Sequence, residues 1–167
     1  DTCLLSAAFN GHLDIVKYLL NNGSSIFDRN FSGESCILCA AENGHLDIVK
    51  WLVTQGCSVT DTATDGNTVL LNAIYGGNKE LIKWLVSNGS SLDERNTQGE
   101  TSLIIASNLG DLPLIEWLVI EKNCSLQETS RIGTCFMIAC YKNHFDCIIW
   151  MLQNGSSMDE NNILDIH

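Results

Sequence analysis

The sequence predicts an all-α solenoid built from five tandem units of about 33 residues. Two columns of residues that recur with this period carry the prediction. The first column is made of small residues: Ala7, Ala40, Ala73, Ala106 and Ala139. The second column is aromatic and uses every tryptophan of the chain: Tyr18, Trp51, Trp84, Trp117 and Trp150. A fixed period of this length is typical of repeat proteins, in which each unit buries its apolar face against its neighbours.

Each unit contains the pattern of two short amphipathic helices followed by an extended polar loop. In the second unit, Ser35 is a suitable N-cap for a first helix, and Gly44 supplies the left-handed residue that ends it. A second helix is expected over residues 45–53, where Ile48, Val49, Leu52 and Val53 form one apolar stripe. The other units repeat this pattern, so the histidines His12, His45 and His144, replaced elsewhere by Asn78 and Asp111, are expected to start second helices in a capping role.

No linker rich in proline, glycine or serine divides the chain, so we expect one array over residues 1–167. Its repeats are expected at about 1–29, 30–62, 63–95, 96–129 and 130–162, and the last residues begin a further unit or a tail. The fourth repeat carries one extra residue, and we expect this irregularity to be confined to the loop between about Lys122 and Thr134.

The chain starts inside a repeat and without an initiator methionine, so we expect a monomeric array that belongs to a longer protein. Terminal repeats of solenoids usually carry a polar outer face. Here Leu4, Leu5, Ala8 and Phe9 are expected to face outward at the N-terminus, which favours a further repeat before them.

The net charge of −11, with 20 acidic against nine basic residues, disfavours nucleic acid as a partner. It favours a protein partner with a basic or mixed surface, since acidic fields attract cationic partners. No apolar run reaches the length of a membrane span, so direct membrane insertion is not expected.

The eight cysteines are expected to be reduced and to fill small buried spaces. Cys3, Cys36 and Cys135 share one column of the repeat, and the other units place Val69 and Ser102 there. Reduced cysteines of this kind favour a cytoplasmic location, with the nucleus as the alternative.

No catalytic, metal or cofactor site is predicted. Cys36-x-x-Cys39 lacks the second pair of ligands that a zinc site needs and the strand-to-helix context of a redox motif. No nucleophile motif, phosphate-binding loop or carboxylate pair stands out elsewhere. We therefore expect a protein that is not an enzyme and binds no cofactor.

The repeat unit resembles the ankyrin repeat, on the strength of the stretches AAFNGHLDIVKYLL over residues 7–20 and AAENGHLDIVKWL over residues 40–52. The resemblance implies a stack of helix-turn-helix units with hairpin-like loops, here called fingers, on one edge. It also implies that partners are bound by the finger tips and by the exposed face of the first helices. One departure is clear: the family's Thr-Pro-Leu-His tetrapeptide becomes, for example, Thr68-Val69-Leu70-Leu71. The hydrogen-bond network of the family's histidine is therefore in doubt.

Two sets of residues break the repeat and are the candidate partner-binding residues. The first lies two positions after each periodic alanine, at the end of the first helix, on a surface that faces partners in the family: Phe9, Glu42, Tyr75, Asn108 and Tyr141. The second set lies in the fingers: Phe31, Glu34, Asp65, Asn67, Arg95, Gln98 and Glu100. Exposed aromatic residues and acidic loops are also ordinary features of a solvated surface, and that alternative stays open.

The sequence therefore predicts a protein–protein interaction module. The alternative is a regulatory or scaffolding segment of a larger enzyme or channel, whose activity lies in other parts of that protein.

Overall fold

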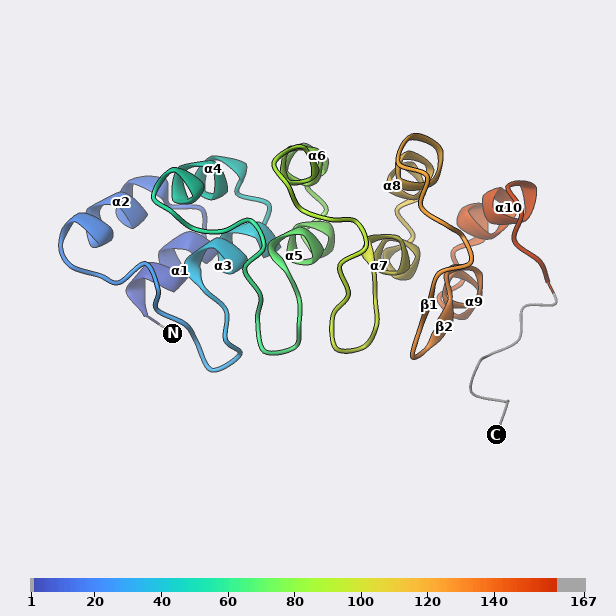
Figure 1. The fold of residues 1–167 in the computed structure, drawn as a ribbon, viewed down its shortest axis with the longest axis horizontal. Coiled ribbons are helices and arrows are strands. Elements are labelled where there is room, and N and C mark those ends of the chain that lie inside the picture. Colours follow the sequence, from blue (N-terminus) through green and yellow to red (C-terminus); the bar gives the residue numbers. More distant parts are fainter. Residues whose placement is uncertain (1, 159–167) are drawn as a thin grey trace. The chain divides into compact units, whose positions relative to one another are not determined.

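The computed structural model describes residues 2–158, and within this range it confirms an all-α repeat architecture of five helix pairs (Figure 1). The first helices of the pairs are α1 (Cys3–Phe9), α3 (Cys36–Glu42), α5 (Val69–Tyr75), α7 (Ser102–Leu109) and α9 (Cys135–Tyr141). The second helices are α2 (Leu13–Asn21), α4 (Leu46–Thr54), α6 (Lys79–Ser87), α8 (Leu112–Glu116) with its continuation η1 (Trp117–Glu121), and α10 (Phe145–Gln153). One finger forms a short antiparallel hairpin of β1 (Thr129–Ser130) and β2 (Gly133–Thr134).

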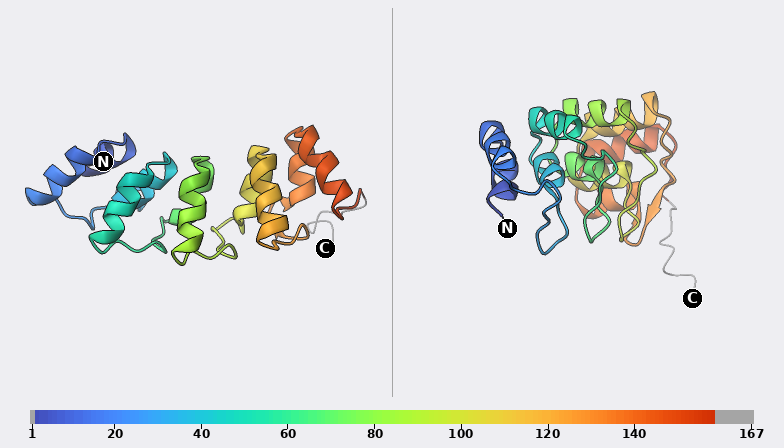
Figure 2. Two further views of the ribbon diagram at one scale, coloured as in Figure 1. Left: turned by 90° about the horizontal axis from the view of Figure 1, so that it is seen from above. Right: turned by 60° about the vertical axis from the view of Figure 1, so that its left-hand side comes forward.

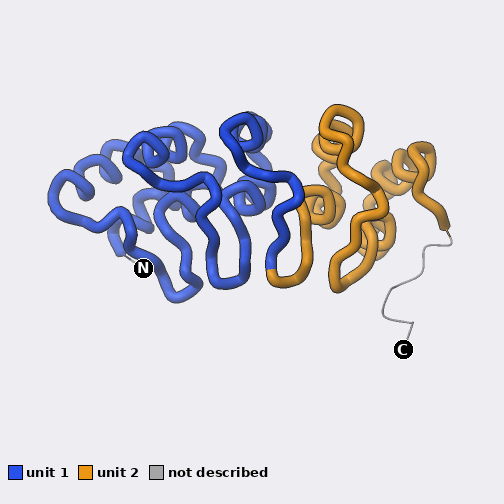
Figure 3. Tube along the Cα trace, viewed as in Figure 1, with its two compact units in different colours: residues 1–96 blue, residues 97–167 orange. Residues whose placement is uncertain are grey.

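The chain divides into two compact units, residues 1–96 and residues 97–167 (Figure 3). In the first unit, α1, α3 and α5 form one layer and α2, α4 and α6 form a second layer beside it (Figures 1 and 2). The second unit pairs α7 with α8 and α9 with α10 in the same way. The single array over residues 1–167 stays a prediction. The expected further unit or tail after residue 162 lies outside the described residues, as do residues 159–162 of the expected fifth repeat.

The core of the first unit is centred on α3, which packs between α1 and α5. Its Ile37 and Leu38 are fully buried, and Ala40 and Ala41 are small enough to let the neighbouring helices approach closely. A helix of seven residues is not stable in isolation. Burying a side chain such as Leu38 contributes about 1.5–3 kcal/mol, so the packing between neighbouring helices stabilises each one.

The extra residue of the fourth repeat lies inside a helix, so its expected confinement to the loop is wrong. In the second repeat, a Cys57 N–H to Leu52 carbonyl hydrogen bond of 3.1 Å closes the end of α4 across five residues. In the fourth repeat, the corresponding bond from Cys124 N–H to the Leu118 carbonyl spans six residues. The helix widens into the π-helical turn η1 to take up the insertion. The finger that follows is one residue shorter, because Gly133 directly precedes Thr134.

The first helices are tied to the next finger by a bond between a hydroxyl and a carboxylate. The Thr68 hydroxyl accepts a hydrogen bond from Leu71 N–H and donates one of 2.5 Å to the Glu94 carboxylate. In the second unit, Thr101 donates to Glu128 in the same manner. Ser35 precedes α3 as predicted, but it makes no side-chain capping bond, and its hydroxyl donates to Asp61 at 2.5 Å. These bonds supply the polar contacts that the altered Thr-Pro-Leu-His tetrapeptide left in doubt.

The histidines that precede the second helices do not cap them, which corrects the expected capping role. His45 precedes α4 without a side-chain capping bond, and its Nε2 lies 2.9 Å from the carbonyl oxygen of Phe9 in the preceding repeat. His144 makes the matching contact with the Asn108 carbonyl. Asn78 does both tasks, since its Oδ1 accepts from Leu81 N–H and its Nδ2 donates to the Gly44 carbonyl at 2.7 Å.

The N-terminal helix pair buries three of the four residues that were expected to face outward. Leu4, Leu5 and Ala8 are buried, because α1 packs against both α2 and α3. Phe9 alone among the four is exposed, together with Ile15 and Tyr18 of α2. That part of the expectation is therefore wrong for Leu4, Leu5 and Ala8.

The link between hydroxyl and carboxylate predicts a specific loss of stability. Thr68→Val keeps the shape of the side chain, but it removes the acceptor of Leu71 N–H and one of the hydrogen bonds to the Glu94 carboxylate, which keeps its bond from Ser91 N–H. The substitution is therefore expected to cost about 1–3 kcal/mol in the free energy of unfolding. Urea denaturation measures this change. Thr62→Val, at an exposed finger position, is the control and is expected to change stability by less than about 0.5 kcal/mol. Equal effects of the two substitutions would refute the role of the link.

The contact between His45 and the preceding repeat predicts a difference between two glycines. Gly11 and Gly23 both have positive φ, so alanine at either position is expected to cost about 1–2 kcal/mol from backbone strain. A Cβ at Gly11 would also lie 2.6 Å from the His45 ring, whereas nothing lies within 4 Å of one at Gly23. Gly11→Ala is therefore expected to destabilise the protein by about 1 kcal/mol more than Gly23→Ala in thermal or urea unfolding. A larger effect at Gly23 would contradict this packing.

Candidate functional site

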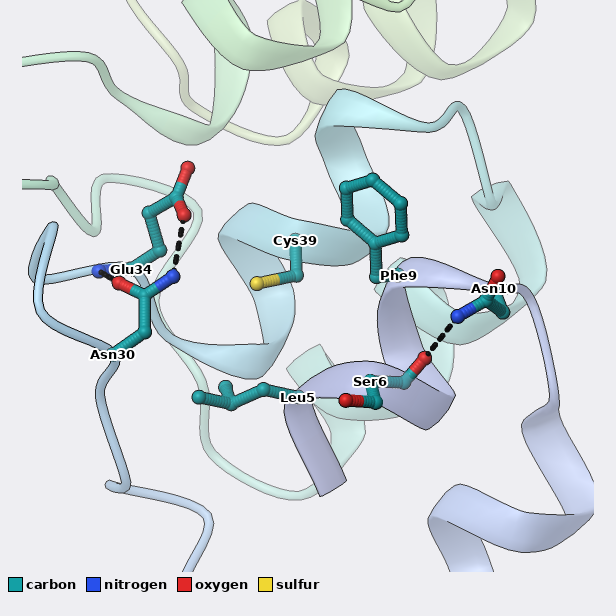
Figure 4. A pocket seen from close by; sticks show the side chains of 7 residues that line it. All are labelled: Leu5, Ser6, Phe9, Asn10, Asn30, Glu34 and Cys39. Atoms are coloured by element: carbon teal, nitrogen blue, oxygen red, sulfur yellow. Dashed lines mark hydrogen bonds between the residues drawn. The ribbon is translucent and has the colours of Figure 1, made fainter. Parts of the chain in front are cut away.

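A hollow of about 210 Å³ lies in the first unit between α1, α3 and the finger that precedes α3 (Figure 4). Its lining consists of Leu5, Ser6, Phe9, Asn10, Asn30, Glu34 and Cys39. Phe9 and Glu34 lie at opposite sides of it, with Leu5 and Cys39 between them (Figure 4). The hollow is smaller than typical cofactor pockets, and its size suits a single side chain.

Glu34 is held at the edge of the hollow by the turn that ends the finger. Asn30 Oδ1 accepts a hydrogen bond from Glu34 N–H at 2.9 Å, and Asn30 Nδ2 donates to the Glu34 carboxylate at 2.6 Å. Gly33 allows this turn because its φ of +74° is a conformation that other residues rarely adopt. The finger therefore fixes a carboxylate beside an apolar floor.

The charges near the hollow repel one another. Glu42 is exposed, but partial desolvation of its carboxyl group raises its pKa above the usual value, and the carboxylates of Glu34 and Asp65 raise it further. Burial is also the main cause that raises the pKa of Cys39 to about 12, with Glu34 and Glu42 adding to it. Cys39 is therefore a thiol at neutral pH and contributes apolar surface to the floor. We call the surface formed by Phe9, Glu34, Glu42 and Asp65, together with the apolar floor of Leu5 and Cys39, the groove surface.

The structure brings four of the predicted partner-binding residues together in the groove surface. Phe9 ends α1 and keeps 45% of its surface exposed, and Glu42 ends α3 and is exposed. Tyr75 ends α5 at the matching position of the third repeat and is half-buried. Four residues of the column therefore end their first helices as predicted, whereas α7 runs one residue past Asn108 to Leu109.

The predicted finger residues of the first unit differ in how accessible they are. Phe31 is fully exposed in its finger, and Arg95 is exposed as well. Asn67 is held in place by two hydrogen bonds to the Asp65 carboxylate, and its Oδ1 accepts one from Asn96 at 3.0 Å. Asn67 therefore shapes its finger.

The remaining predicted residues belong to the second unit. Tyr141 ends α9 and is 86% exposed, and Gln98 is exposed while its carbonyl accepts a hydrogen bond from Arg131 N–H at 3.0 Å. Glu100 is buried, and Asn108 is half-buried with its carbonyl oxygen engaged by His144. Glu100 and Asn108 therefore present little surface to a partner.

Two sets of contacts were not foreseen from the sequence. Arg29 joins two fingers, because its guanidinium lies 2.9 Å from the Thr62 carbonyl and forms an ion pair of 2.5 Å with Asp61. Lys17 and Lys50 each stack over the tryptophan of the next repeat, with Nζ 5.9 Å from the Trp51 ring and 5.8 Å from the Trp84 ring. The spacing of 33 residues between these lysines, equal to that of the tryptophans, was the available signal.

Three further features bear on chemistry. All eight cysteines lie in the described range, and none is paired in a disulfide. Among residues 2–158, no group of three or more His, Cys, Asp or Glu side chains is arranged to hold a metal ion. None of the helices described is long and apolar enough to cross a membrane.

The helix pairs, the glycine-ended turns and the fingers correspond to a known family. A family model described as Ankyrin repeats (3 copies) matches residues 1–63 and residues 38–130. The chain belongs to the ankyrin-repeat family. Ankyrin repeats are generally protein–protein interaction modules and are typically not catalytic. The family model contains three copies of the repeat, and the fifth helix pair of the chain lies beyond the residues that it matches. No curated protein matches the chain.

The raised pKa of Glu42 predicts a pH-dependent effect of Glu42→Gln. A carboxyl group whose pKa is raised in the folded state destabilises the fold when ionised, and this effect disappears as pH falls through the folded pKa to below its usual value of 4.5. Glu42→Gln is therefore expected to stabilise the protein at pH 7, by about 0.5 kcal/mol or less because the side chain is exposed, and to be neutral at about pH 3.5. Urea denaturation at the two pH values measures this. A destabilising effect at pH 7 would contradict the repulsion.

Proposed function

We propose that this ankyrin array is a protein–protein interaction module that binds its partner through the groove surface of the first unit. The observation that carries the proposal is the juxtaposition in Figure 4 of an exposed aromatic ring, an apolar floor and a fixed carboxylate around one hollow. Aromatic side chains in partly enclosed positions are the common anchors of protein interfaces. The ring of Phe9 is the anchor in this proposal.

The charge of the groove surface supports a partner segment that is basic and apolar. Glu34 and Asp65 raise the pKa of Glu42, so a cation placed among these carboxylates would relieve their repulsion. A lysine or arginine side chain carries an apolar stem that suits the floor and a charged head that suits the carboxylates. The partner residue next to it would contact the ring of Phe9.

The other parts of the proposal rest on the family, on the charge and on the eight unpaired cysteines. We propose that the array itself is monomeric, has no catalytic activity, and acts in the cytoplasm or nucleus. A net charge of −11 supports a protein partner and not nucleic acid. A role as the scaffolding segment of a larger protein is compatible with the same binding surface.

Selection from a peptide display library of balanced charge tests this proposal, because the selected peptides reveal which residues the protein prefers to bind. The expected result is enrichment of peptides that place lysine or arginine beside an aromatic or aliphatic residue. Enrichment of acidic peptides would contradict the proposal. Selected peptides that do not compete with one another for one site would contradict it as well.

Variants of the groove surface provide the quantitative prediction. Phe9→Ala is expected to weaken binding of a selected peptide about tenfold or more, because the anchor ring is lost. Phe27→Ala removes an exposed ring elsewhere in the first unit and is the matched control, with affinity expected to stay within about twofold. Isothermal titration calorimetry measures both. Equal losses in the two variants would show that Phe9 is no anchor.

Two triple variants that each remove three negative charges test the role of the carboxylates in the groove surface. The triple variant Glu34→Gln, Glu42→Gln, Asp65→Asn is expected to weaken binding and to reduce its dependence on salt. The control Asp14→Asn, Asp47→Asn, Glu80→Gln removes the same charge from the first turns of the second helices. If both triple variants weaken binding alike, only the net charge matters and the groove assignment fails.

A further inference from the structure

The lysines of the first unit all lie in its second helices. Residues 1–96 contain four lysines, and each belongs to α2, α4 or α6. Three of them share one column of the repeat, namely Lys17, Lys50 and Lys83, and we call this column the lysine row. Because α2, α4 and α6 form one layer (Figures 1 and 2), the lysine row crosses three neighbouring helices.

Aromatic rings hold two ammonium groups of the lysine row in place. Lys17 Nζ lies 5.9 Å from the centre of the Trp51 ring, and Lys50 Nζ lies 5.8 Å from the centre of the Trp84 ring. A cation over the face of an indole ring is attracted by it, which restricts the otherwise flexible lysine side chain. Each ammonium group is therefore positioned before a partner arrives, so a partner that pairs with it loses less conformational entropy on binding.

The donors of these two ammonium groups are not used within the part of the chain that the structure describes. Among residues 2–158, neither Lys17 nor Lys50 forms an ion pair or a side-chain hydrogen bond. Asp14 and Asp47 lie three positions before them on the same helices, yet no ion pair joins either carboxylate to its lysine. Lys50 is exposed and Lys17 is half-buried, so the three donors of each ammonium group can meet a carboxylate of a partner.

The spacing of the lysine row suits one backbone conformation of a partner. The first helices α1, α3 and α5 pack directly on one another, and packed helices lie about 8–10 Å apart, so successive lysines of the row repeat at about 10 Å. A polyproline II segment has three residues per turn, so every third side chain lies on the same side, about 9 Å from the last. In a β-strand, residues three apart point to opposite faces. Acidic residues at every third position of a polyproline II segment therefore match the row.

Aromatic rings and carboxylates flank the lysine row and restrict the partner further. The Tyr18 side chain is 66% exposed, and Trp51 and Trp84 are half-buried. Aromatic surfaces of this kind are common docking sites for proline-rich segments. Asp14 and Asp47 lie one helical turn from the row and repel a segment that is acidic at every position. Uncharged residues, and prolines in particular, are therefore favoured between the acidic positions.

We propose that the lysine row is a second docking surface, and that its occupant is a proline-rich segment of another protein with an acidic residue at every third position. The carboxylates of this segment pair with successive lysines, and the prolines between them lie against the aromatic rings. This surface goes beyond the proposed function, because the groove surface takes a basic segment. Nucleic acid fits the row less well, since DNA carries one charge per about 1.7 Å and the many carboxylates of the chain repel it.

Binding of two synthetic peptides to the whole chain tests the proposal. The probe consists of three Glu-Pro-Pro triplets with blocked ends, and the control peptide has the same composition with its three glutamates together at one end. Isothermal titration calorimetry at low ionic strength is expected to show at least about fivefold tighter binding of the triplet peptide, because only its carboxylates follow the spacing of the row. Added salt is expected to weaken this binding.

Two double variants separate the lysine row from the net charge. Lys17→Gln with Lys50→Gln is expected to weaken binding of the triplet peptide about fivefold or more. Lys122→Gln with Lys142→Gln is the matched control, because it removes the same charge and two contacts between a lysine and an aromatic ring, but in the second unit. Its affinity is expected to stay within about twofold of the wild-type value. Circular dichroism checks that both variants are folded.

Three outcomes would overturn the proposal. Equal affinity for the two peptides would show that the spacing of the row is not recognised, and equal losses in the two double variants would leave only the net charge. Binding of a single-stranded oligonucleotide more tightly than the triplet peptide, lost in the variant of Lys17 and Lys50, would assign the row to nucleic acid. None of these outcomes affects the groove surface, which is lined by other residues and is tested with basic peptides.

Discussion

The structure depends on the burial of each short helix against the helices of neighbouring repeats. The helix α3 has seven residues, too few for an isolated helix in water, yet its residues from Cys36 to Ala41 are all buried because α1 and α5 cover it. The period of 33 residues follows from this constraint, since every repeat must present the same faces to its neighbours. The alanine column is therefore fixed by packing, whereas Phe9 and Phe31, which depart from the period, keep exposed surface that a partner can contact.

Polar links between repeats follow the same period and account for several acidic residues. Asp61 and Glu94 accept hydrogen bonds from the hydroxyls that precede the first helices, so these carboxylates hold the fingers in place. Glu34 and Asp65 differ from them, because Glu34 lines the hollow and both carboxylates raise the pKa of Glu42. The acidic residues are thus divided between carboxylates that hold the fingers in place and carboxylates that repel one another near the hollow.

The helix pairs could be predicted from the sequence because alanine and tryptophan columns directly report which side chains pack between repeats. The π-helical turn η1 could not, because an inserted residue can be taken up in the helix or in the loop, and only the six-residue bond from Cys124 to Leu118 decides between them. The contact of His45 with the preceding repeat was missed because capping and bridging residues occupy the same position. In the candidate site, the column containing Phe9 was visible as a break in the period. Its closeness to Glu34 depends on how the finger turns at Gly33, which spacing alone does not reveal.

The claim that residues outside the period perform the binding is tested most directly by nuclear magnetic resonance. Titration of the isotope-labelled protein with a basic peptide selected on it reports each backbone amide separately. Binding at the groove surface predicts that the largest shifts cluster at Ser6, Phe9, Cys39 and Glu42, which lie in or beside the hollow, while the amides of α2 and α4 that face away from it shift little. The largest shifts along α2 and α4, with the groove surface unperturbed, would contradict the account.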